Sequence, residues 1–338
     1  MEPTPDFSLD HATFHAGVRP YRNRTYRLEA ETIGSKFVVH NYGHGGAGIT
    51  MSWGCASVVK DIVMAHGTPA KAAVLGAGVM GLTAATLLAD LNIAVTIYAE
   101  KFTPHTTSDV AGGQWSPSLV NFNENSTTAK LAYFEVLRRA KKAHEARLGL
   151  GFGVSRRWNY TPTRIGHLDM LPRDIIPAAT RLAHLPFQKL RKPGYKYDTL
   201  LVEPPILLAR LQQDLQARAT FVTRKFMKAS ELAALPENVI INCTGLGSKA
   251  LFADTLMAPL KGQLVFLKAQ PGLDYLYSGD GYVFPRSDAV IVGGSQEPIN
   301  NDTPDPVKCR RMVAHAKAVF EGQALLREVL PKWLLQGK

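Results

Sequence analysis

The chain has 338 residues, 46% of them apolar, and 39 Lys and Arg face 28 Asp and Glu for a formal charge of +11. This composition argues against disorder, and at about 150 residues per domain the length suits roughly two domains. Three widely spaced cysteines argue against a disulfide framework and a zinc site, which favours a cytoplasmic location; they are Cys55, Cys243 and Cys309. The chain opens without a basic and apolar leader, and no apolar run approaches about 18 residues, so we expect neither export nor a membrane-spanning helix.

The positive charge is unevenly placed along the chain. Residues 126–200 contain 15 Lys and Arg against 5 Asp and Glu, whereas the rest of the chain contains 24 against 23. Such a segment could contact nucleic acid or anionic lipid. We favour a solvated face or a subunit contact, with no nucleic-acid and no membrane partner.

The first feature in chain order is a short strand at 38–40 that leads into a glycine-rich loop at 40–50, followed by a helix predicted over 53–65. Four glycines within six residues let the backbone pass close to a ligand. The start of the helix, at about residues 49–52, offers free N–H groups and a positive dipole end, which suit an anion or a polarised carbonyl. A tight structural turn without a ligand is the alternative.

A second glycine-rich turn follows a strand predicted over 71–75. Gly76, Gly78 and Gly81 form the pattern Gly-x-Gly-x-x-Gly, and a helix over 82–91, a strand over 93–98 and the acidic Glu100 come next. The three glycines permit a tight turn, close approach of amides to a pyrophosphate, and close packing of helix on strand. The order predicts a dinucleotide site, and it does not distinguish FAD from a nicotinamide.

The remainder of the chain continues the α/β pattern. A helix is predicted over 204–215 and strands over 220–225 and 238–242, while 126–200 is expected to be helical and then irregular. Beyond Gly262, three alternating segments indicate antiparallel strands; they lie at 263–268, 281–285 and 290–294.

Several strings together resemble the D-amino acid oxidase family of FAD-dependent enzymes. The resemblance covers nearly the whole chain and is weakest at 126–200. The strings are Gly-Val-Arg-Pro at 17–20, the loop at 40–50, Trp-Gly-Cys-Ala at 53–56, Gly-Ala-Gly-Val-Met-Gly-Leu at 76–82, Tyr-Ala-Glu-Lys-Phe-Thr-Pro at 98–104, Thr-Thr-Ser-Asp-Val-Ala-Gly-Gly at 106–113, Asn-Cys-Thr-Gly at 242–245 and Gly-Tyr-Val-Phe-Pro at 281–285.

The order of these strings departs from the family, in which the glycine fingerprint opens the chain. Moving residues 1 to about 68 behind Lys338 restores the family order throughout. The chain is therefore interpreted as a circular permutant, a change that domains tolerate when their termini lie close together at the surface. The new join at 66–71 can span at most about 18 Å.

The resemblance implies a fold of two parts. An FAD-binding, Rossmann-like α/β domain is expected from 37–125 and 201–257. A substrate-binding domain with a mixed or antiparallel sheet is expected from 1–36, 126–200 and 258–338.

The resemblance also implies the residues that hold FAD, from the pyrimidine end of the flavin to the adenosine. They are Gly45, Gly46, Ala47, Gly48, Ile49, Thr50, Gly76, Gly78, Val79, Met80, Gly81, Glu100, Lys101, Thr106, Thr107, Ser108, Gly113, Gln114, Phe226 and Thr244.

For the substrate, the resemblance assigns a carboxylate anchor to Arg19, whose planar guanidinium binds a carboxylate through two parallel hydrogen bonds. Tyr282 matches a tyrosine that contacts the same carboxylate, and Tyr277 is a looser match for a second one, with Tyr275 as its competitor. The backbone carbonyl of Gly46 would receive the substrate amine. Near these motifs lie three candidates for the side-chain pocket: Gln114, Ser116 and Arg286.

The activity implied is oxidation of an amino acid, most simply a D-amino acid, to a 2-oxo acid, ammonia and hydrogen peroxide, with oxygen as the second substrate. The alternatives are an oxidase or dehydrogenase of glycine, a secondary amine or an L-amino acid, a nicotinamide-dependent reductase, and a flavoprotein that binds nucleic acid. A homodimer is compatible with the sequence, and no metal-binding constellation is evident in it.

Overall fold

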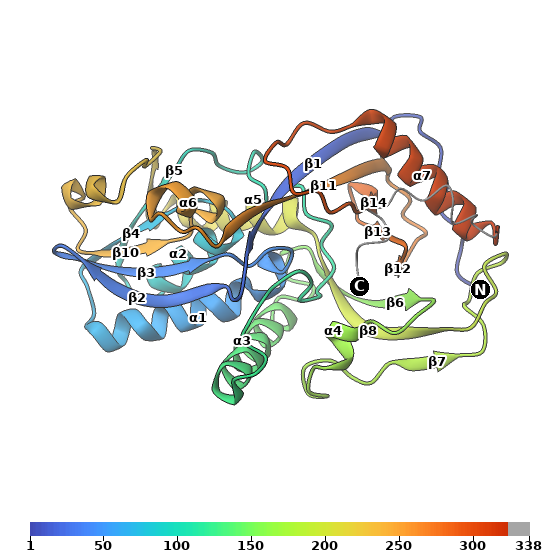
Figure 1. Ribbon diagram of the computed structural model, residues 1–338, viewed down its shortest axis with the longest axis horizontal. Coiled ribbons are helices and arrows are strands. Elements are labelled where there is room, and N and C mark those ends of the chain that lie inside the picture. The colour runs from blue at the N-terminus through green and yellow to red at the C-terminus, as the bar shows by residue number, and fades with distance from the viewer. Residues whose placement is uncertain (324–338) are drawn as a thin grey trace.

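A computed structural model describes residues 1–323 of the chain. These residues form two β-sheets that lie beside each other along the long axis of the molecule (Figure 1). One sheet has six strands and the other eight, and both mix parallel with antiparallel pairs. The α/β class expected from the sequence is confirmed. Among residues 1–323, no helix combines the length and the apolar character that crossing a lipid bilayer requires.

The six-stranded sheet contains every strand predicted around the glycine fingerprint. Five of its strands are mutually parallel, and the edge strand β2 runs antiparallel to β3. In sheet order the strands are β2 (Arg27–Ile33), β3 (Lys36–Tyr42), β10 (Val239–Asn242), β4 (Lys71–Leu75), β5 (Ala94–Ala99) and β9 (Ala219–Thr223). The fingerprint strand β4 is therefore central, which explains its unbroken apolar sequence.

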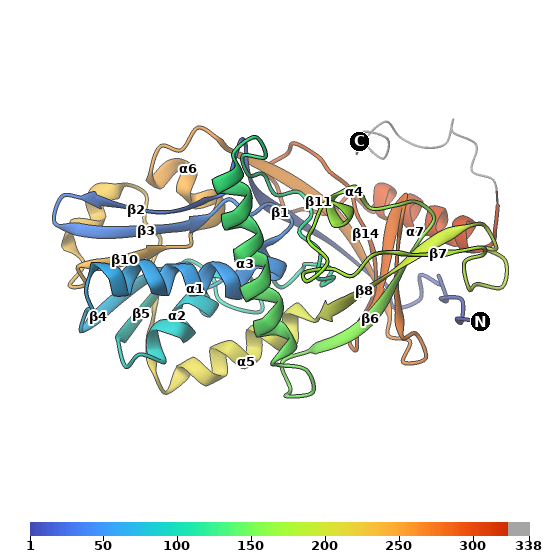
Figure 2. The same ribbon diagram turned by 90° about the horizontal axis from the view of Figure 1, so that it is seen from below.

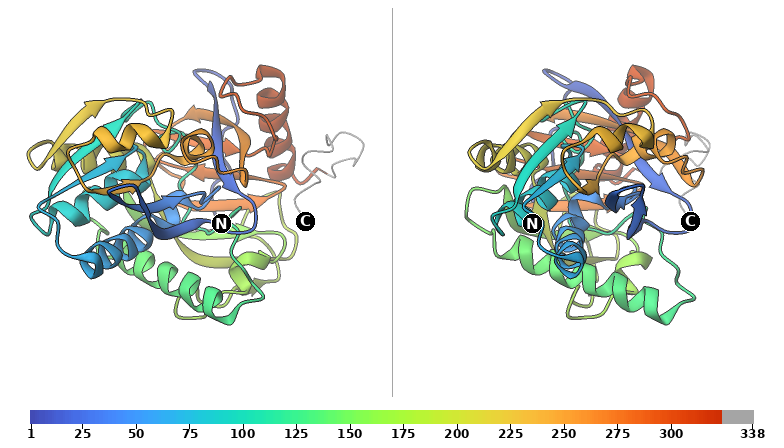
Figure 3. Two further views of the ribbon diagram at one scale, coloured as in Figure 1. Left: turned by 60° about the vertical axis from the view of Figure 1, so that its left-hand side comes forward. Right: turned by 90° about the vertical axis from the view of Figure 1, so that its left-hand side faces the viewer.

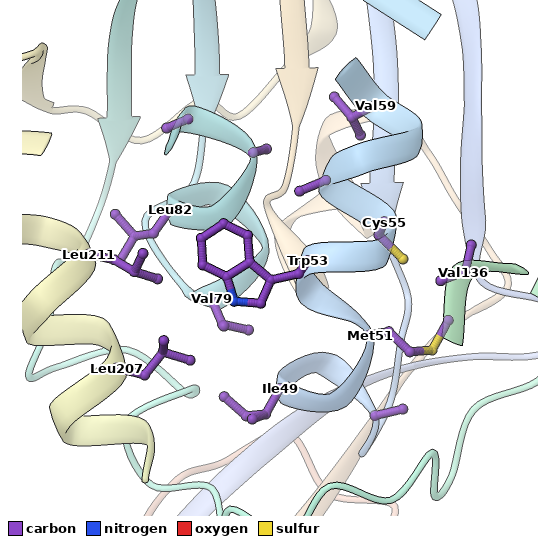
Figure 4. Packing of buried hydrophobic residues seen from close by; sticks show 14 of the residues in the cluster. Ile49, Met51, Trp53, Cys55, Val59, Val79, Leu82, Val136, Leu207 and Leu211 are labelled. Atoms are coloured by element: carbon purple, nitrogen blue, oxygen red, sulfur yellow. The ribbon is translucent and has the colours of Figure 1, made fainter. Parts of the chain in front are cut away.

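Helices cover one face of this sheet (Figure 2). They are α1 (Gly48–His66), α2 (Val79–Ala89), α5 (Pro204–Gln216) and α3 (Thr127–Glu145), which crosses α1. The crossing is close, because a Cβ at Gly54 would lie 2.0 Å from the carbonyl oxygen of Val136. Trp53 points from α1 toward Val79 and Leu82 of α2 and is buried there (Figure 4).

The opposite face of the six-stranded sheet is closed by shorter elements. These are the 3₁₀ turns η1 (Ala229–Ala234) and η2 (Gly245–Gly247) and the helix α6 (Ser248–Leu251). Consecutive residues of β4 point to opposite faces of the sheet. Val74 lies in the core on the helix side, and Leu75 lies in the core on the other side.

The eight-stranded sheet forms the second half of the molecule. In sheet order its strands are β1 (Thr13–Arg22), β11 (Met257–Lys268), β14 (Ala289–Gly293), β13 (Gly281–Pro285), β12 (Tyr275–Gly279), β6 (Val154–Thr161), β8 (Gly194–Val202) and β7 (Thr180–Leu182). The helix α7 (Pro306–Phe320) packs on its outer face (Figure 3). The short helix α4 (Gly166–Asp169) lies between β6 and β7 in the sequence.

The structure places two segments differently from the division expected from the sequence. β2 pairs with β3 along its whole length, so the six-stranded sheet begins at residue 27 rather than 37. Helix α3 packs on α1, which adds 127–145 to the same half. Each segment is connected along the chain to a strand of the eight-stranded sheet. Only its contacts in the folded structure assign it to the other half of the molecule.

The basic segment 126–200 is partly neutralised by acidic partners. Arg139 pairs with Asp61 of α1 at 2.5 Å, and Arg156 pairs with Asp198 at 2.8 Å. Arg138 bonds to the carboxylate of Asp174. These pairs lie on exposed surface, so each contributes little to stability, and of the three acids only Asp61 lies outside residues 126–200 and lowers the charge excess of that segment.

Candidate active site

A cleft of about 1530 Å³ lies between the two sheets. The loops that follow β3, β4, β5 and β10 enter it, because the carboxyl ends of parallel strands meet at one edge of a sheet. From the other side it is lined by β1, β12 and β13 of the eight-stranded sheet. The cleft therefore has a backbone-lined end and a sheet-lined end.

At the backbone-lined end, two of the three fingerprint glycines lie where no side chain fits. Gly76 has a φ of +104°, and a Cβ there would lie 2.5 Å from the carbonyl oxygen of Cys243. A Cβ at Gly81 would lie 1.9 Å from the carbonyl oxygen of Gly76. Gly78 is the N-cap of α2 and lines the cleft without a capping side chain. Backbone amides of the turn thus face the space where a pyrophosphate would bind.

The second glycine-rich loop reaches the same cleft and leads directly into α1. Gly45 has a φ of +55°, and a Cβ there would lie 1.8 Å from the carbonyl oxygen of Leu119. The helix begins at Gly48, earlier than predicted, and its N-cap Ala47 provides no side-chain hydrogen bond. The first-turn N–H groups therefore lack a side-chain acceptor at the positive end of a 19-residue helix.

The far part of the backbone-lined end carries charged and aromatic side chains. Lys225 donates to Glu100 at 3.0 Å, and the guanidinium of Arg224 lies 4.4 Å from the ring centre of Phe226. Thr244 donates to the side-chain carbonyl of Asn242 at 2.8 Å. Of these six residues, five line the cleft and Asn242 is buried beneath it.

At the sheet-lined end, Arg19 and Tyr282 lie together. Arg19 donates from Nη1 to the backbone carbonyl of Ser295 at 3.0 Å, and within residues 1–323 it pairs with no carboxylate. Burial raises the pKa of Tyr282, and the positive charge of Arg19 opposes that rise. The hydroxyl is therefore protonated near neutral pH, and both side chains can donate hydrogen bonds to an anion in the cleft.

Glycines on neighbouring strands make room for these two side chains. A Cβ at Gly262 would lie 2.4 Å from Nη2 of Arg19, and a Cβ at Gly293 would lie 2.5 Å from the hydroxyl oxygen of Tyr282. The ring of Tyr282 also stacks on Phe284, with centroids 4.3 Å apart. The arrangement holds both donors in one orientation.

A buried polar network supports Arg19 from behind, and the sequence carried no signal for it. Ser295, whose carbonyl holds Arg19, accepts from the backbone N–H of Gln263 at 2.9 Å and donates to Glu297 at 2.7 Å. Lys308 of α7 donates to the same carboxylate at 2.6 Å. Helix α7 thus helps to fix the position of Arg19 from the outer face of the sheet.

Most of the residues expected to bind cofactor or substrate line the cleft. They are Arg19, Gly45, Gly46, Gly48, Ile49, Gly76, Gly78, Val79, Met80, Glu100, Lys101, Thr106, Thr107, Ser108, Gly113, Gln114, Phe226, Thr244 and Tyr282. Three others lie beneath its wall: Ala47, Thr50 and Gly81. The hydroxyl of Thr50, for example, is occupied by hydrogen bonds with both backbone groups of Ser116, each 3.0 Å long.

Tyr277 does not line this cleft, contrary to expectation. Its ring packs against Phe187 and Phe320 in the core beneath α7. Ser278 takes the position in the cleft instead, because it pairs directly with Tyr282 across β12 and β13, and paired residues point to the same face. Tyr275, its competitor, also lies in that core.

The pocket candidates are divided by the structure as well. Gln114 and Ser116 line the cleft, whereas Arg286 is bound by Asp288 at 2.6 Å and does not line it. His167 of α4 also lines the cleft, with Nε2 2.8 Å from Oγ of Ser116. The sequence offered no signal for His167, because it lies in the segment where the family resemblance is weakest.

Comparison of the chain with known proteins identifies a family. The family model described as FAD dependent oxidoreductase (DAO) matches residues 71–334. The chain belongs to this family. It is an enzyme, an FAD-dependent oxidoreductase of the D-amino acid oxidase type.

Individual relatives agree with this assignment. The chain is 27% identical to a D-aspartate oxidase of Homo sapiens, over 77% of this chain and 79% of that protein. It is 26% identical to a D-amino-acid oxidase of Rubrobacter xylanophilus, over 74% of this chain and 77% of that protein. Among solved structures, iminodiacetate oxidase from Chelativorans sp. BNC1 shares the fold with a TM-score of 0.54 and 18% identity, covering 74% of this chain and 78% of that chain.

The cofactor of the family fits the residues present. The cleft exceeds the roughly 300–1,000 Å³ of an ordinary small-molecule pocket, which leaves room for a dinucleotide and a substrate. Gly76 and Gly78 would hold the pyrophosphate of FAD through their backbone, and the α1 start at Gly48 would face the flavin ring. The positive helix end suits the negative charge that a flavin gains on reduction.

Proposed function

We propose that this protein oxidises amino acids, most simply D-amino acids, to 2-oxo acids with release of ammonia and hydrogen peroxide. The observation that carries the proposal is Arg19, a cation that lines the cleft without a carboxylate partner in the described part of the chain. Arg19 is partly buried, and a partly buried guanidinium without a carboxylate partner is available to bind an anionic ligand group. The α-carboxylate of an amino acid supplies it.

The chain's own residues would bind and orient this substrate. Arg19 would hold the α-carboxylate, and the hydroxyl of Tyr282 would donate a further hydrogen bond to it. The backbone carbonyl of Gly46 would accept from the substrate amine. Three fixed contacts on one small molecule define the direction in which the α-hydrogen points, and this orientation is the largest contribution that the protein makes to such a reaction.

FAD, when bound, supplies the redox chemistry by accepting a hydride from the α-carbon and passing the two electrons to oxygen. The resulting imine reacts with water to give the 2-oxo acid and ammonia. Amino acid, oxygen and water are thus consumed, and 2-oxo acid, ammonia and hydrogen peroxide are formed. The substrate amine must be neutral when the hydride leaves, so its ammonium form gives one proton to water, and we assign no protein side chain as a base.

The test combines a spectrum with a product assay. The FAD-loaded protein is mixed anaerobically with each enantiomer of a panel of amino acids, with glycine and with a secondary amine, and the loss of the flavin absorption band is followed. Peroxide is then measured in air. We expect D-amino acids to bleach the flavin and to yield peroxide. If only L-amino acids, glycine or the secondary amine bleach the flavin, that compound is the substrate in place of D-amino acids. Bleaching without peroxide would indicate a dehydrogenase.

We also propose that the chain is a circular permutant of its family. The family model begins to match at residue 71, the first residue of β4, which leaves the Arg19 strand and the glycine-rich loop ahead of it. Helix α1 ends at His66 and β4 begins at Lys71, so only four residues form the proposed join. A chain with residues 1–68 moved behind Lys338 is expected to fold and bind FAD; failure of that chain to bind FAD would count against the proposal.

Location and assembly stay predictions. We expect a cytoplasmic enzyme, to be checked by cell fractionation, and a homodimer compatible with the basic face, to be checked by sedimentation at several concentrations.

A further inference from the structure

The segment that carries His167 is fixed firmly against the sheet. Tyr197 of β8 accepts from the backbone N–H of Ile165 at 2.9 Å and donates to Asp169 at 3.1 Å. Leu168 is fully buried in the same hydrophobic core as the buried residues of α1 and α2. Because residues on both sides of His167 are anchored, its imidazole is held in place at the wall of the cleft.

His167 forms a pair with Ser116 across the wall of the cleft. Its Nε2 lies 2.8 Å from Oγ of Ser116. Burial lowers the pKa of His167 to about 4, so the imidazole is neutral near pH 7 and carries one N–H. The pair then has two polar hydrogens, the imidazole N–H and the serine O–H, and one of them forms the hydrogen bond between the two side chains. In either tautomer one donor and one acceptor remain for another group.

The pair is connected to the carboxylate anchor through a row of polar side chains. Ser278 is the direct cross-strand partner of Tyr282, and its Oγ lies 3.4 Å from Oε1 of Gln114. Gln114 and Ser116 line the cleft while Trp115 between them is buried in the core, as expected for an extended segment. Alternate side chains in such a segment lie about 7 Å apart. The row therefore extends away from Tyr282 over the length of an amino-acid side chain.

One member of this row has an unused donor. Nε2 of Gln114 is buried and has no hydrogen-bond partner within the described residues. A buried amide donor without a partner costs free energy, which a polar ligand group recovers on binding. The subsite is thus built for hydrogen bonds rather than for an apolar side chain.

We propose that His167, held by Ser116, is a specificity-determining residue that selects substrates with an uncharged hydrogen-bonding side chain, a carboxamide above all. The proposal rests on the proposed function and names the substrate class of that same site. A carboxamide offers one acceptor and one donor type, which matches what the His167–Ser116 pair presents.

Side chains of other chemistry match this pair less well. A carboxylate only accepts hydrogen bonds, so it would face the acceptor of the pair without a proton between them. A cation that also lines the cleft, Arg164, already pairs with Asp169 at 2.6 Å. An apolar side chain would leave both groups of the pair and the Gln114 donor without partners.

The experiment compares substrates of nearly equal size. kcat/KM is measured for D-asparagine, D-aspartate and D-leucine, and again for D-glutamine, D-glutamate and D-methionine. For the wild type we expect the amide to exceed both companions by at least about tenfold in each set. His167→Leu should remove most of this preference, chiefly through a higher KM for the amides, whereas His167→Gln, which keeps a neutral hydrogen-bonding group, should retain part of it.

Two controls separate recognition from folding. Ser116→Ala removes only the hydroxyl, since the bonds to Thr50 use the backbone of Ser116, and should reduce the preference in the same direction. His184→Leu changes an exposed histidine on the loop between β7 and β8 and should leave the preference within about twofold. FAD binding and the thermal midpoint are measured for every variant.

The outcomes distinguish the two proposals. If no amino acid reduces the flavin, the proposed function fails. If D-amino acids are oxidised but the amides are not preferred, or if His167→Leu keeps FAD and the wild-type preference, the assignment of His167 is overturned while the function stands.

Discussion

The two ends of the cleft are built by different means. The proposed nucleotide end is lined by the backbone of Gly76, Gly78 and Gly48, and at Gly76 a side chain would collide with backbone. The proposed substrate end is lined by the side chains of Arg19 and Tyr282, which sit on strands far apart in the sequence.

This difference determines how each end responds to change. An added Cβ in the glycine turn collides with backbone, which cannot move aside cheaply, so folding and cofactor binding should fail together. Loss of a polar atom at the substrate end leaves the fold intact and weakens only one contact. Three substitutions and a change of pH test this contrast.

Gly81→Val should abolish FAD binding and lower the free energy of unfolding by at least about 3 kcal/mol, because its Cβ would lie 1.9 Å from the carbonyl oxygen of Gly76. Flavin content and urea unfolding measure both effects. Gly272→Val is the matched control, since a Cβ there has nothing within 4 Å. A Gly81 variant with normal flavin content would show that helix and strand do not need this close approach.

Arg19→Ala should retain FAD and fold normally but lose on the order of a hundredfold or more in kcat/KM toward α-amino acids, since the charged contact with the carboxylate is removed. Arg19→Lys should fall between the two, because an ammonium keeps the charge without the planar fork. Stopped-flow flavin reduction gives the rates. An unchanged kcat/KM would mean that another group anchors the carboxylate.

Acid should destabilise the nucleotide end through His144 of α3. Its Nε2 donates to the backbone carbonyl of Ile49 in the first turn of α1 at 3.0 Å, and burial lowers the pKa of His144 to about 4. The unfolded chain, with a histidine pKa near 6.5, binds more protons between these values, so stability is full above about pH 6.5 and falls as the pH drops toward 4.

We expect His144 to account for a loss on the order of 1–2 kcal/mol between pH 7 and pH 5. Urea unfolding at both values measures it. His144→Gln, which can still donate to Ile49 but does not titrate, should show a smaller loss. Equal losses in wild type and variant would assign the acid sensitivity to other groups.

Tyr282→Phe should have the smallest effect, a rise of about tenfold in the KM for amino acids with FAD binding unchanged. The phenyl ring keeps the stacking on Phe284, so only the hydroxyl contact is lost. Steady-state kinetics of the variant provide the test. A large fall in kcat with an unchanged KM would instead indicate that the hydroxyl acts during the chemical step.

Sequence reasoning went furthest where function depends on adjacent residues. The strand of 71–75, the glycine turn and the following acid all lie within a single run of the chain, and each has a local physical signature. The start of α1 at Gly48 lies just before the predicted start at about residues 49–52, and a glycine at that position is a weak helix former that gives little local signal.

What only the tertiary structure decided is which side chains share the substrate end. Tyr277 and Ser278 are neighbours in sequence, and the register of β12 against β13 determines that Ser278 faces the cleft and Tyr277 the core. His167 reaches Ser116 only because Tyr197 anchors α4 to β8. The sequence by itself determined the family, the cofactor and the glycine turn, since these follow from local spacing. Strand register and long-range packing are not written in any local pattern, because a shift of one residue reverses every side chain of a strand.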